Sequence, residues 1–144
     1  MIGIDFDNTL VHVNNNNNYD IMPEVQEYLP LLYKKGFRFS IITGRNDCDK
    51  QFVRNVATDL ENKMNIVFDN IFLTNDFPTK GSIAKSLGCK YLIDDKYSYL
   101  SDCKINDVIP IFLNHKNKNI VTKKKNVLYS WKQVYELLTN DKLL

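Results

Sequence analysis

Ile2-Gly3-Ile4-Asp5-Phe6-Asp7-Asn8-Thr9-Leu10 is an apolar run that ends in two carboxylates one residue apart, followed by a turn-forming Asn and a Thr. Alternate residues of an extended segment share a face, so Asp5 and Asp7 can point into one crevice where the strand ends. Two carboxylates that close repel each other and stay ionised only when a cation joins them or one takes a proton. Divalent-metal chemistry is therefore the first hypothesis.

Outward from this stretch, strand-like and helix-like segments alternate. Pro23 suits the first turn of a helix, and Gly36 and Gly88 suit helix stops. The expected strands are residues 2–6, 37–42, 66–73, 91–93 and 108–113, with a short extended piece at 11–13. The expected helices are residues 23–36, 49–62, 79–87 and 130–139, with a helical turn at 97–101. This alternation favours an α/β, three-layer Rossmann-like parallel sheet with helices on both faces and ligands outside the carboxyl ends of its strands.

Composition narrows the class of protein. A length of 144 residues indicates one domain, and a net charge of +2 is too small for a general polyanion binder. The three cysteines show no CxxC spacing and are typical of free thiols in a reducing compartment. We find neither a signal peptide nor an apolar run of the ~18 residues that suggest a membrane span, so we expect a cytoplasmic location and no membrane partner.

Polar residues follow the strands at the edge where this fold binds ligands. The second long strand ends in Thr43-Gly44-Arg45, the third helix opens with Thr79-Lys80-Gly81, and the fourth long strand ends in Asp94-Asp95. A carboxylate can act as a nucleophile, a hydroxyl and an ammonium can hold phosphate oxygens, and several carboxylates can hold Mg²⁺. Together with Asp5 and Asp7, these sets indicate phosphoryl transfer.

The ordered set resembles the haloacid dehalogenase (HAD) superfamily. Its four motifs would be residues 4–10, the segment Ile42-Thr43-Gly44-Arg45, Lys80, and the segment Ile93-Asp94-Asp95. A DxD after a strand is common by chance, whereas four motifs in this order are specific. The likeness covers residues 1 to about 115.

The resemblance implies a role for each motif residue. Asp5 would be the nucleophile that forms an aspartyl-phosphate, and Asp7 the general acid and then the base. The backbone carbonyl of Asp7 would also bind Mg²⁺. Thr43 and Lys80 would hold the transferring phosphoryl group. Asp94 is the expected direct Mg²⁺ ligand, and Asp95 a water-mediated ligand or an orienter of Lys80.

Further implications concern substrate and size. Asn8, Thr9, Gly44 and Arg45 are the expected substrate-binding neighbours of the motifs, although for Arg45 a surface ion pair is an equal alternative. We expect residues 1–144 to form a single HAD-like domain with a flap at about 10–22, because neither 11–22 nor 73–80 can hold a cap domain. Capless members often act on large substrates.

The expected function is thus a Mg²⁺-dependent phosphatase acting on a phosphorylated substrate. The narrower alternative is a nucleotidase or polynucleotide-end phosphatase, and the non-enzyme alternative is a catalytically silent HAD-like binding module. A receiver domain is disfavoured, because in such domains the Asp pair precedes the acceptor Asp, whereas here the expected acceptor Asp5 comes first and the pair Asp94-Asp95 last. The Lys-rich loop 116–125 could bind nucleic acid, but a solvated loop is the preferred interpretation. His12 and His115 are not expected to bind metal.

Overall fold

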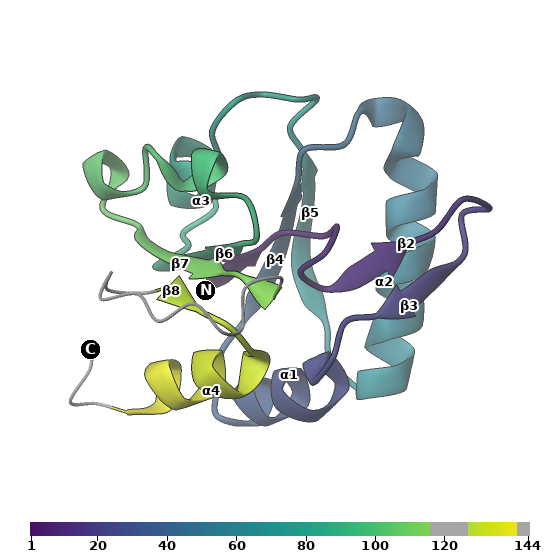
Figure 1. Cartoon of the computed structure of the whole chain (residues 1–144), viewed down its shortest axis with the longest axis horizontal. Helices are drawn as coiled ribbons and strands as arrows, with labels where there is room; N and C mark the ends of the chain where they lie inside the picture. Colours follow the sequence, from purple (N-terminus) through teal and green to yellow (C-terminus); the bar gives the residue numbers. More distant parts are fainter. Residues whose placement is uncertain (116–126, 141–144) are drawn as a thin grey trace.

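The computed structural model describes residues 1–115 and 127–140, which form an α/β fold around a parallel sheet (Figure 1). Within these residues the main sheet has six strands in the order β5-β4-β1-β6-β7-β8, and every pairing is parallel. The strands are β1 (Ile2–Ile4), β4 (Phe39–Thr43), β5 (Phe68–Leu73), β6 (Tyr91–Asp94), β7 (Ile109–Leu113) and β8 (Val127–Leu128). The expected three-layer Rossmann-like architecture is confirmed.

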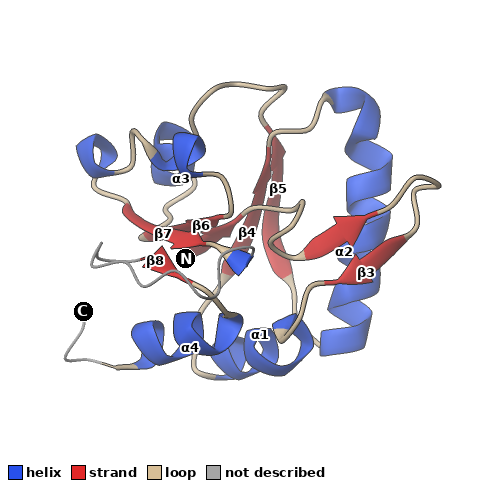
Figure 2. Cartoon of the chain, in the orientation of Figure 1, coloured by secondary structure: helices blue, strands red, loops and turns tan. Residues whose placement is uncertain are grey.

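Helices cover both faces of the sheet, as Figure 2 shows. One face carries α1 (Val25–Lys34), α2 (Lys50–Met64) and α4 (Trp131–Thr139), and the other carries α3 (Gly81–Ser86) and short 3₁₀ turns. Because strand residues alternate between faces, Ile41 enters the first core and Ile42 the second. The two cores hold the sheet rigid from both sides and fix the carboxyl ends of its strands.

The helix ends follow their local sequence, with small differences from expectation. Gly36 and Gly88 adopt positive φ values of 100° and 78° after their helices, as their stop roles require. The first helix begins at Val25 rather than Pro23, and Glu24 before it has a φ of 71°. The third helix begins at Gly81, so Lys80 precedes it instead of lying in its first turn.

The flap is an antiparallel hairpin of β2 (Val11–Val13) and β3 (Tyr19–Ile21). The Asn-rich run 14–18 forms its tip, whereas the strand β3 was not expected from the sequence. The Lys63 ammonium lies 5.8 Å from the centre of the Tyr19 ring, which ties the hairpin to α2. Leu10 accepts a backbone hydrogen bond from Met22, which closes the base of the hairpin. No large cap covers the sheet within the described residues.

The last helix reaches back to the first motif. Ser130 caps α4 by accepting a hydrogen bond from the backbone of Gln133. Trp131 is fully buried, and its indole Nε1 donates to the Thr9 carbonyl at 3.0 Å. The strand β8 was not expected, and the Lys-rich loop 116–125 lies outside the described residues. No helix in the described part of the chain has the length and apolarity needed to cross a membrane.

Candidate active site

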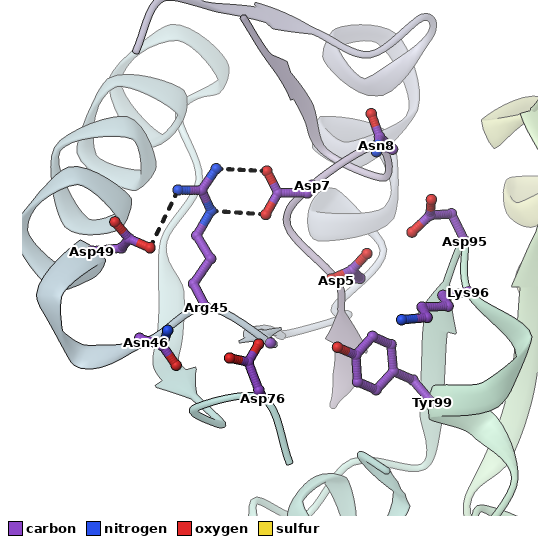
Figure 3. Close-up of a pocket in the computed structure, with 11 residues that line it drawn as sticks. Asp5, Asp7, Asn8, Arg45, Asn46, Asp49, Asp76, Asp95, Lys96 and Tyr99 are labelled. Atoms are coloured by element: carbon purple, nitrogen blue, oxygen red, sulfur yellow. Dashed lines mark hydrogen bonds and ion pairs between the residues drawn. The ribbon is translucent and has the colours of Figure 1, made fainter. Parts of the chain in front are cut away.

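The carboxyl ends of β1, β4 and β6 border one open pocket of about 550 Å³ (Figure 3). The register pairs Ile4 with Ile41 on one side and Ile93 on the other, so the residues that follow these strands meet at one edge. The residues that line the pocket are Asp5, Asp7, Asn8, Gly44, Arg45, Asn46, Asp49, Asp76, Asp95, Lys96 and Tyr99. Motifs that lie far apart in the sequence therefore converge at the end of β1.

Lys80 makes a buried ion-pair cluster beneath the pocket. Its side chain is fully buried, and its Nζ lies 2.7 Å from Asp5 Oδ1 and 2.7 Å from Asp94 Oδ2. The Thr9 hydroxyl donates to Asp5 Oδ2 at 3.2 Å, and the Lys96 backbone N–H donates to Asp94 Oδ1 at 2.9 Å. Asp5 is thereby fixed from both carboxylate oxygens, and both oxygens of Asp94 already accept hydrogen bonds.

Asp102 positions Lys80 from outside the pocket. Its two carboxylate oxygens accept hydrogen bonds from the backbone N–H groups of Gly81 (2.7 Å) and Ser82 (3.1 Å) at the start of α3. A Cβ at position 81 would lie 2.5 Å from Asp102 Oδ1, so only glycine allows this close approach. Sequence reasoning missed Asp102, because a carboxylate 21 residues after Gly81 gives no local signal.

Burial and neighbouring charges raise the pKa of two carboxyl groups in the acidic cluster. Burial, followed by the charge of Asp5, raises the pKa of Asp94 to about 7. Burial is the largest cause that raises the pKa of Asp95 to about 8, followed by a hydrogen bond with Asp5 and by the negative charge of Asp5. Burial alone would lower the pKa of Lys80, but the carboxylates of Asp5 and Asp94 more than offset this and leave it raised. One ammonium therefore does not neutralise the three carboxylates.

These three carboxylates fit a divalent cation. Oxygen atoms of Asp5, Asp94 and Asp95 lie within 4.8 Å of one another, and they form the one group of potential metal ligands found among residues 1–115 and 127–140. Carboxylate oxygens are the ligands that Mg²⁺ prefers. Burial and the charge of Asp5 raise the pKa of Asp94 and Asp95, and a divalent cation beside them would favour their ionised forms. The Asp7 carboxylate does not belong to this group.

The Asp7 carboxylate instead pairs with Arg45 at the open side of the pocket. Arg45 Nε and Nη2 each donate to Asp7 at 2.8 Å, and its Nη1 lies 3.6 Å from Asp49 Oδ2. The guanidinium also stacks near the rings of Phe6 and Phe52, at 5.6 Å and 5.2 Å from their centres. Figure 3 shows this group on the opposite side of Asp5 from Asp95. Arg45 thus makes the ion pair that the sequence left as one of two alternatives.

Two other positions of the second motif, Thr43 and Gly44, act differently from Arg45. Thr43 is buried, lies behind the lining residues, and its hydroxyl accepts a hydrogen bond from the Arg45 backbone N–H at 3.3 Å. At Gly44, a Cβ would lie 2.6 Å from the Tyr99 hydroxyl oxygen, so glycine makes room for that ring.

Several lining residues were missed by sequence reasoning. The Tyr99 ring is 4.4 Å from Lys80 Nζ and 4.9 Å from Lys96 Nζ, measured to its centre. Asn46, Asp49 and Asp76 complete the rim. Lys96 and Tyr99 follow β6, at the start of a 3₁₀ turn and within it. They lie only a few residues after motif four, and this nearness in sequence was the only signal that could have found them.

Of three comparisons with known proteins, the one with solved structures supports the fold. No family model matches the sequence, and no curated protein matches it significantly. A HAD-superfamily hydrolase from Ehrlichia chaffeensis matches in structure with a TM-score of 0.65 and 14% identity, over 99% of this chain and 96% of that chain. The fold is HAD-like.

Two other solved structures extend this likeness. A 3-deoxy-D-manno-octulosonate 8-phosphate phosphatase from Moraxella catarrhalis, in complex with magnesium, phosphate and KDO, matches with a TM-score of 0.53 and 19% identity, over 95% of this chain and 83% of that chain. A chain of the Pnkp1/Rnl/Hen1 RNA repair complex matches with a TM-score of 0.56 and 17% identity, over 78% of this chain. The aligned region spans 41% of that chain, less than half its length.

Proposed function

We propose that this chain is a Mg²⁺-dependent phosphomonoester hydrolase that works through an aspartyl-phosphate on Asp5. The observation that carries the proposal is the fixation of Asp5 at the pocket floor by Lys80 and the Thr9 hydroxyl, beside two further carboxylates. Such fixation aims a nucleophile and leaves little reorganisation for the reaction itself. The HAD-like fold and the ordered motifs support the same conclusion.

Asp5 and Asp7, the two acids of the first motif, have different roles in the proposed reaction. An Asp5 oxygen attacks phosphorus, the bond from phosphorus to the ester oxygen breaks, and Asp7 gives that oxygen its proton. Asp7 then takes a proton from water, whose oxygen attacks phosphorus; the bond between phosphorus and the Asp5 oxygen breaks, which releases inorganic phosphate and restores the Asp5 carboxylate. Asp7 cannot donate a proton while both its oxygens accept from Arg45, so Arg45 must turn away, toward Asp49 or the substrate.

The same acidic cluster would bind the Mg²⁺ ion. Asp5, Asp95 and the backbone carbonyl of Asp7 are the proposed Mg²⁺ ligands, because these three residues line the pocket. Asp94 is fully buried behind the lining residues and holds Lys80 instead. This exchanges the roles that the sequence suggested for Asp94 and Asp95. A bound Mg²⁺ supplies positive charge that offsets the carboxylates and the incoming phosphate.

The remaining motif residues hold the substrate phosphate. Lys80 offers its charge from below, and Asn8, Gly44 and Arg45 line the pocket where phosphate oxygens would lie. Thr9 and Thr43 are buried and act through neighbours: Thr9 holds Asp5, and the Thr43 hydroxyl holds the backbone of Arg45. Both remain proposed site residues.

Replacement of Asp5 tests the mechanism. We expect Asp5→Asn to lower kcat on a phosphomonoester by on the order of 10³-fold or more, because the nucleophile is lost. Asp20→Asn, an exposed hairpin position, is the matched control and should retain activity. The assay is phosphate release with Mg²⁺ from nucleoside monophosphates, sugar phosphates, phosphopeptides and 3′-phosphorylated oligonucleotides. Full activity in Asp5→Asn contradicts the mechanism, and no hydrolysis of any substrate by the wild type favours a silent binding module.

A further inference from the structure

A second cavity of about 340 Å³ adjoins the first pocket. The residues that line it are Asn8, His12, Met22, Asp95, Leu113, Asn114 and His115. Asn8 and Asp95 line both cavities, so they form the border between them. Figure 3 shows Asp95 on the side of Asp5 that faces away from Arg45, and Asn8 above Asp5, beyond Asp7. A molecule with its phosphate over Asp5 could therefore extend across this border.

The two cavities differ in chemistry. The first is lined by five carboxylates and by the cations Arg45 and Lys96. The second offers the hydrocarbon of Met22 and Leu113, two imidazoles and two carboxamides, with Asp95 as the one carboxylate among its described lining residues. The apolar surface of Met22 and Leu113 favours an uncharged group with apolar surface in the second cavity, and the carboxylate of Asp95 at its border disfavours a second anion.

The border residue Asn8 is held in an unusual conformation. Its φ is 61°, in the left-handed region that few residues other than glycine adopt. Its side-chain Oδ1 lies 2.8 Å from Nδ1 of His12, and its backbone N–H donates to the Val11 carbonyl at 2.6 Å. The hairpin therefore fixes the Asn8 carboxamide between the two cavities, with its oxygen engaged by the imidazole and its NH₂ group left to donate to a ligand.

We infer that the second cavity binds the group esterified to the substrate phosphate and that this group is an uncharged aromatic ring, a nucleobase or a simple aryl group. The inference rests on the proposed function and names the substrate class of that site. A methionine sulfur and imidazole rings favour planar aromatic partners, and the two asparagines can hydrogen-bond ring nitrogens or carbonyls. A volume of about 340 Å³ lies within the range of small-molecule sites.

Two matched substrate pairs test the inference. Benzyl phosphate is compared with ethyl phosphate, and adenosine 5′-monophosphate with ribose 5-phosphate, so that each pair differs mainly in the ring. We expect the aromatic member to show a kcat/KM about 10- to 100-fold higher, mostly through a lower KM, as burial of one ring predicts. A preference in the nucleotide pair alone assigns the cavity to a nucleobase, and a preference in both pairs assigns it to aromatic groups in general.

Met22 variants locate the preference. Met22 is partly exposed on the segment that follows β3, outside the residues proposed for the chemistry. We expect Met22→Glu to reduce the preference for the aromatic member at least about tenfold, because a carboxylate replaces apolar surface. The conservative variant Met22→Leu should retain the preference. A preference that survives Met22→Glu unchanged overturns the inference.

A reaction whose leaving group is water, with no organic group, separates the two hypotheses. Exchange of ¹⁸O between water and inorganic phosphate with Mg²⁺ needs only the aspartyl-phosphate, not the second cavity. Exchange together with equal kcat/KM values within both substrate pairs overturns the cavity inference and leaves the proposed function standing. Absence of both exchange and hydrolysis overturns the proposed function, and the inference with it.

Discussion

Two cation–carboxylate clusters hold the two acids of the first motif, and they differ in burial. Lys80, Asp5 and Asp94 have side-chain exposures of 0%, 8% and 0%. Arg45 and Asp7 have side-chain exposures of 21% and 37%. The buried cluster holds the proposed nucleophile and the exposed cluster holds the proposed proton donor.

The difference in burial matches the different tasks of the two acids. A nucleophile benefits from a fixed position, and a buried ammonium with two carboxylate partners cannot exchange them for water. A proton donor must change its protonation state and partners during one turnover. Arg45 has a second carboxylate, Asp49, at 3.6 Å and can therefore release Asp7 without losing all its charge partners. The structure thus pairs a rigid half-site with an adjustable one.

Removal of the buried cation should give the largest effect. We expect Lys80→Met to lower the free energy of unfolding by about 3–5 kcal/mol, because it leaves two buried carboxylates without their partner. Activity should be lost as well. The measurement is urea unfolding followed by circular dichroism, alongside phosphate release. A variant as stable as the wild type would show that the buried cluster does not hold the fold, and would break the comparison.

Metal binding should act on the buried cluster in a pH-dependent way. The pKa values of Asp94 and Asp95 are raised to about 7 and about 8, so the folded state binds more protons than the unfolded state above about pH 4. Stability without metal should therefore fall as pH rises from about 4 to about 8. Mg²⁺ at 100 times its Kd should add about 2.7 kcal/mol once the carboxyls are ionised.

Thermal unfolding measures this second effect. The rise in Tm on adding Mg²⁺ should be larger near pH ~8.5 than near pH ~6, where protons compete for the same oxygens. Asp95→Asn removes one titrating group and should flatten the pH dependence of the metal-free protein. A Tm that is insensitive to Mg²⁺ at both pH values would contradict the metal assignment.

Substitution of the exposed cation should affect activity more than stability. Arg45→Lys keeps the charge but loses the two-pronged hydrogen bonding to Asp7. We expect unfolding free energy to change by less than ~1 kcal/mol, because the pair is partly exposed. We expect kcat/KM to fall by about tenfold or more, because a lysine cannot replace the planar guanidinium that is proposed to hold the substrate phosphate once it has left Asp7. Parallel kinetics and unfolding curves measure the two effects. A large loss of stability with normal kinetics would reverse the roles assigned to the two clusters.

A pair with both side chains about half exposed should give the smallest effect. Lys63 and Asp59 lie one helical turn apart on α2, with 3.2 Å between Nζ and Oδ2 and side-chain exposures of 48% and 45%. We expect Lys63→Met to cost about 1 kcal/mol in unfolding free energy, because the ion pair and the contact with the Tyr19 ring are both lost, with kinetics unchanged. Because Lys80→Met and Lys63→Met are the same chemical change, any difference between their losses of unfolding free energy reports the difference in burial. Equal losses at both positions would show that burial is not the deciding variable.

Sequence reasoning found the residues at strand ends because their positions follow from topology alone. Asp5, Thr43 and Asp94 each lie at or just beyond the end of a parallel strand, so they must meet wherever those strands are neighbours. The turn after β6 is different, because the placement of Lys96 and Tyr99 depends on turn geometry that no periodicity encodes. These two lining residues were therefore missed.

The elements and contacts that escaped prediction are short or depend on side-chain rotamers. Strands β3 and β8 have three and two residues, too few for a recognisable alternation, and they form through pairing with a neighbour. The sequence favoured Asp94 over Asp95 as the direct Mg²⁺ ligand, and the proposal reverses this because the Asp95 side chain lines the pocket and the Asp94 side chain does not, a difference set by side-chain directions at the end of β6. The Arg45–Asp7 pair joins residues 38 positions apart and follows from side-chain packing near Phe6 and Phe52.

The hydrogen bond from Trp131 to the Thr9 carbonyl has a consequence for synthesis of the chain. It links residues 122 positions apart, so a ribosome makes the first partner early and the second more than a hundred codons later. Until α4 emerges, the loop that carries Asp5 and Asp7 lacks its indole anchor and the buried wall that Trp131 provides. A nascent or truncated chain ending before Trp131 should therefore carry every residue proposed for catalysis and still be inert.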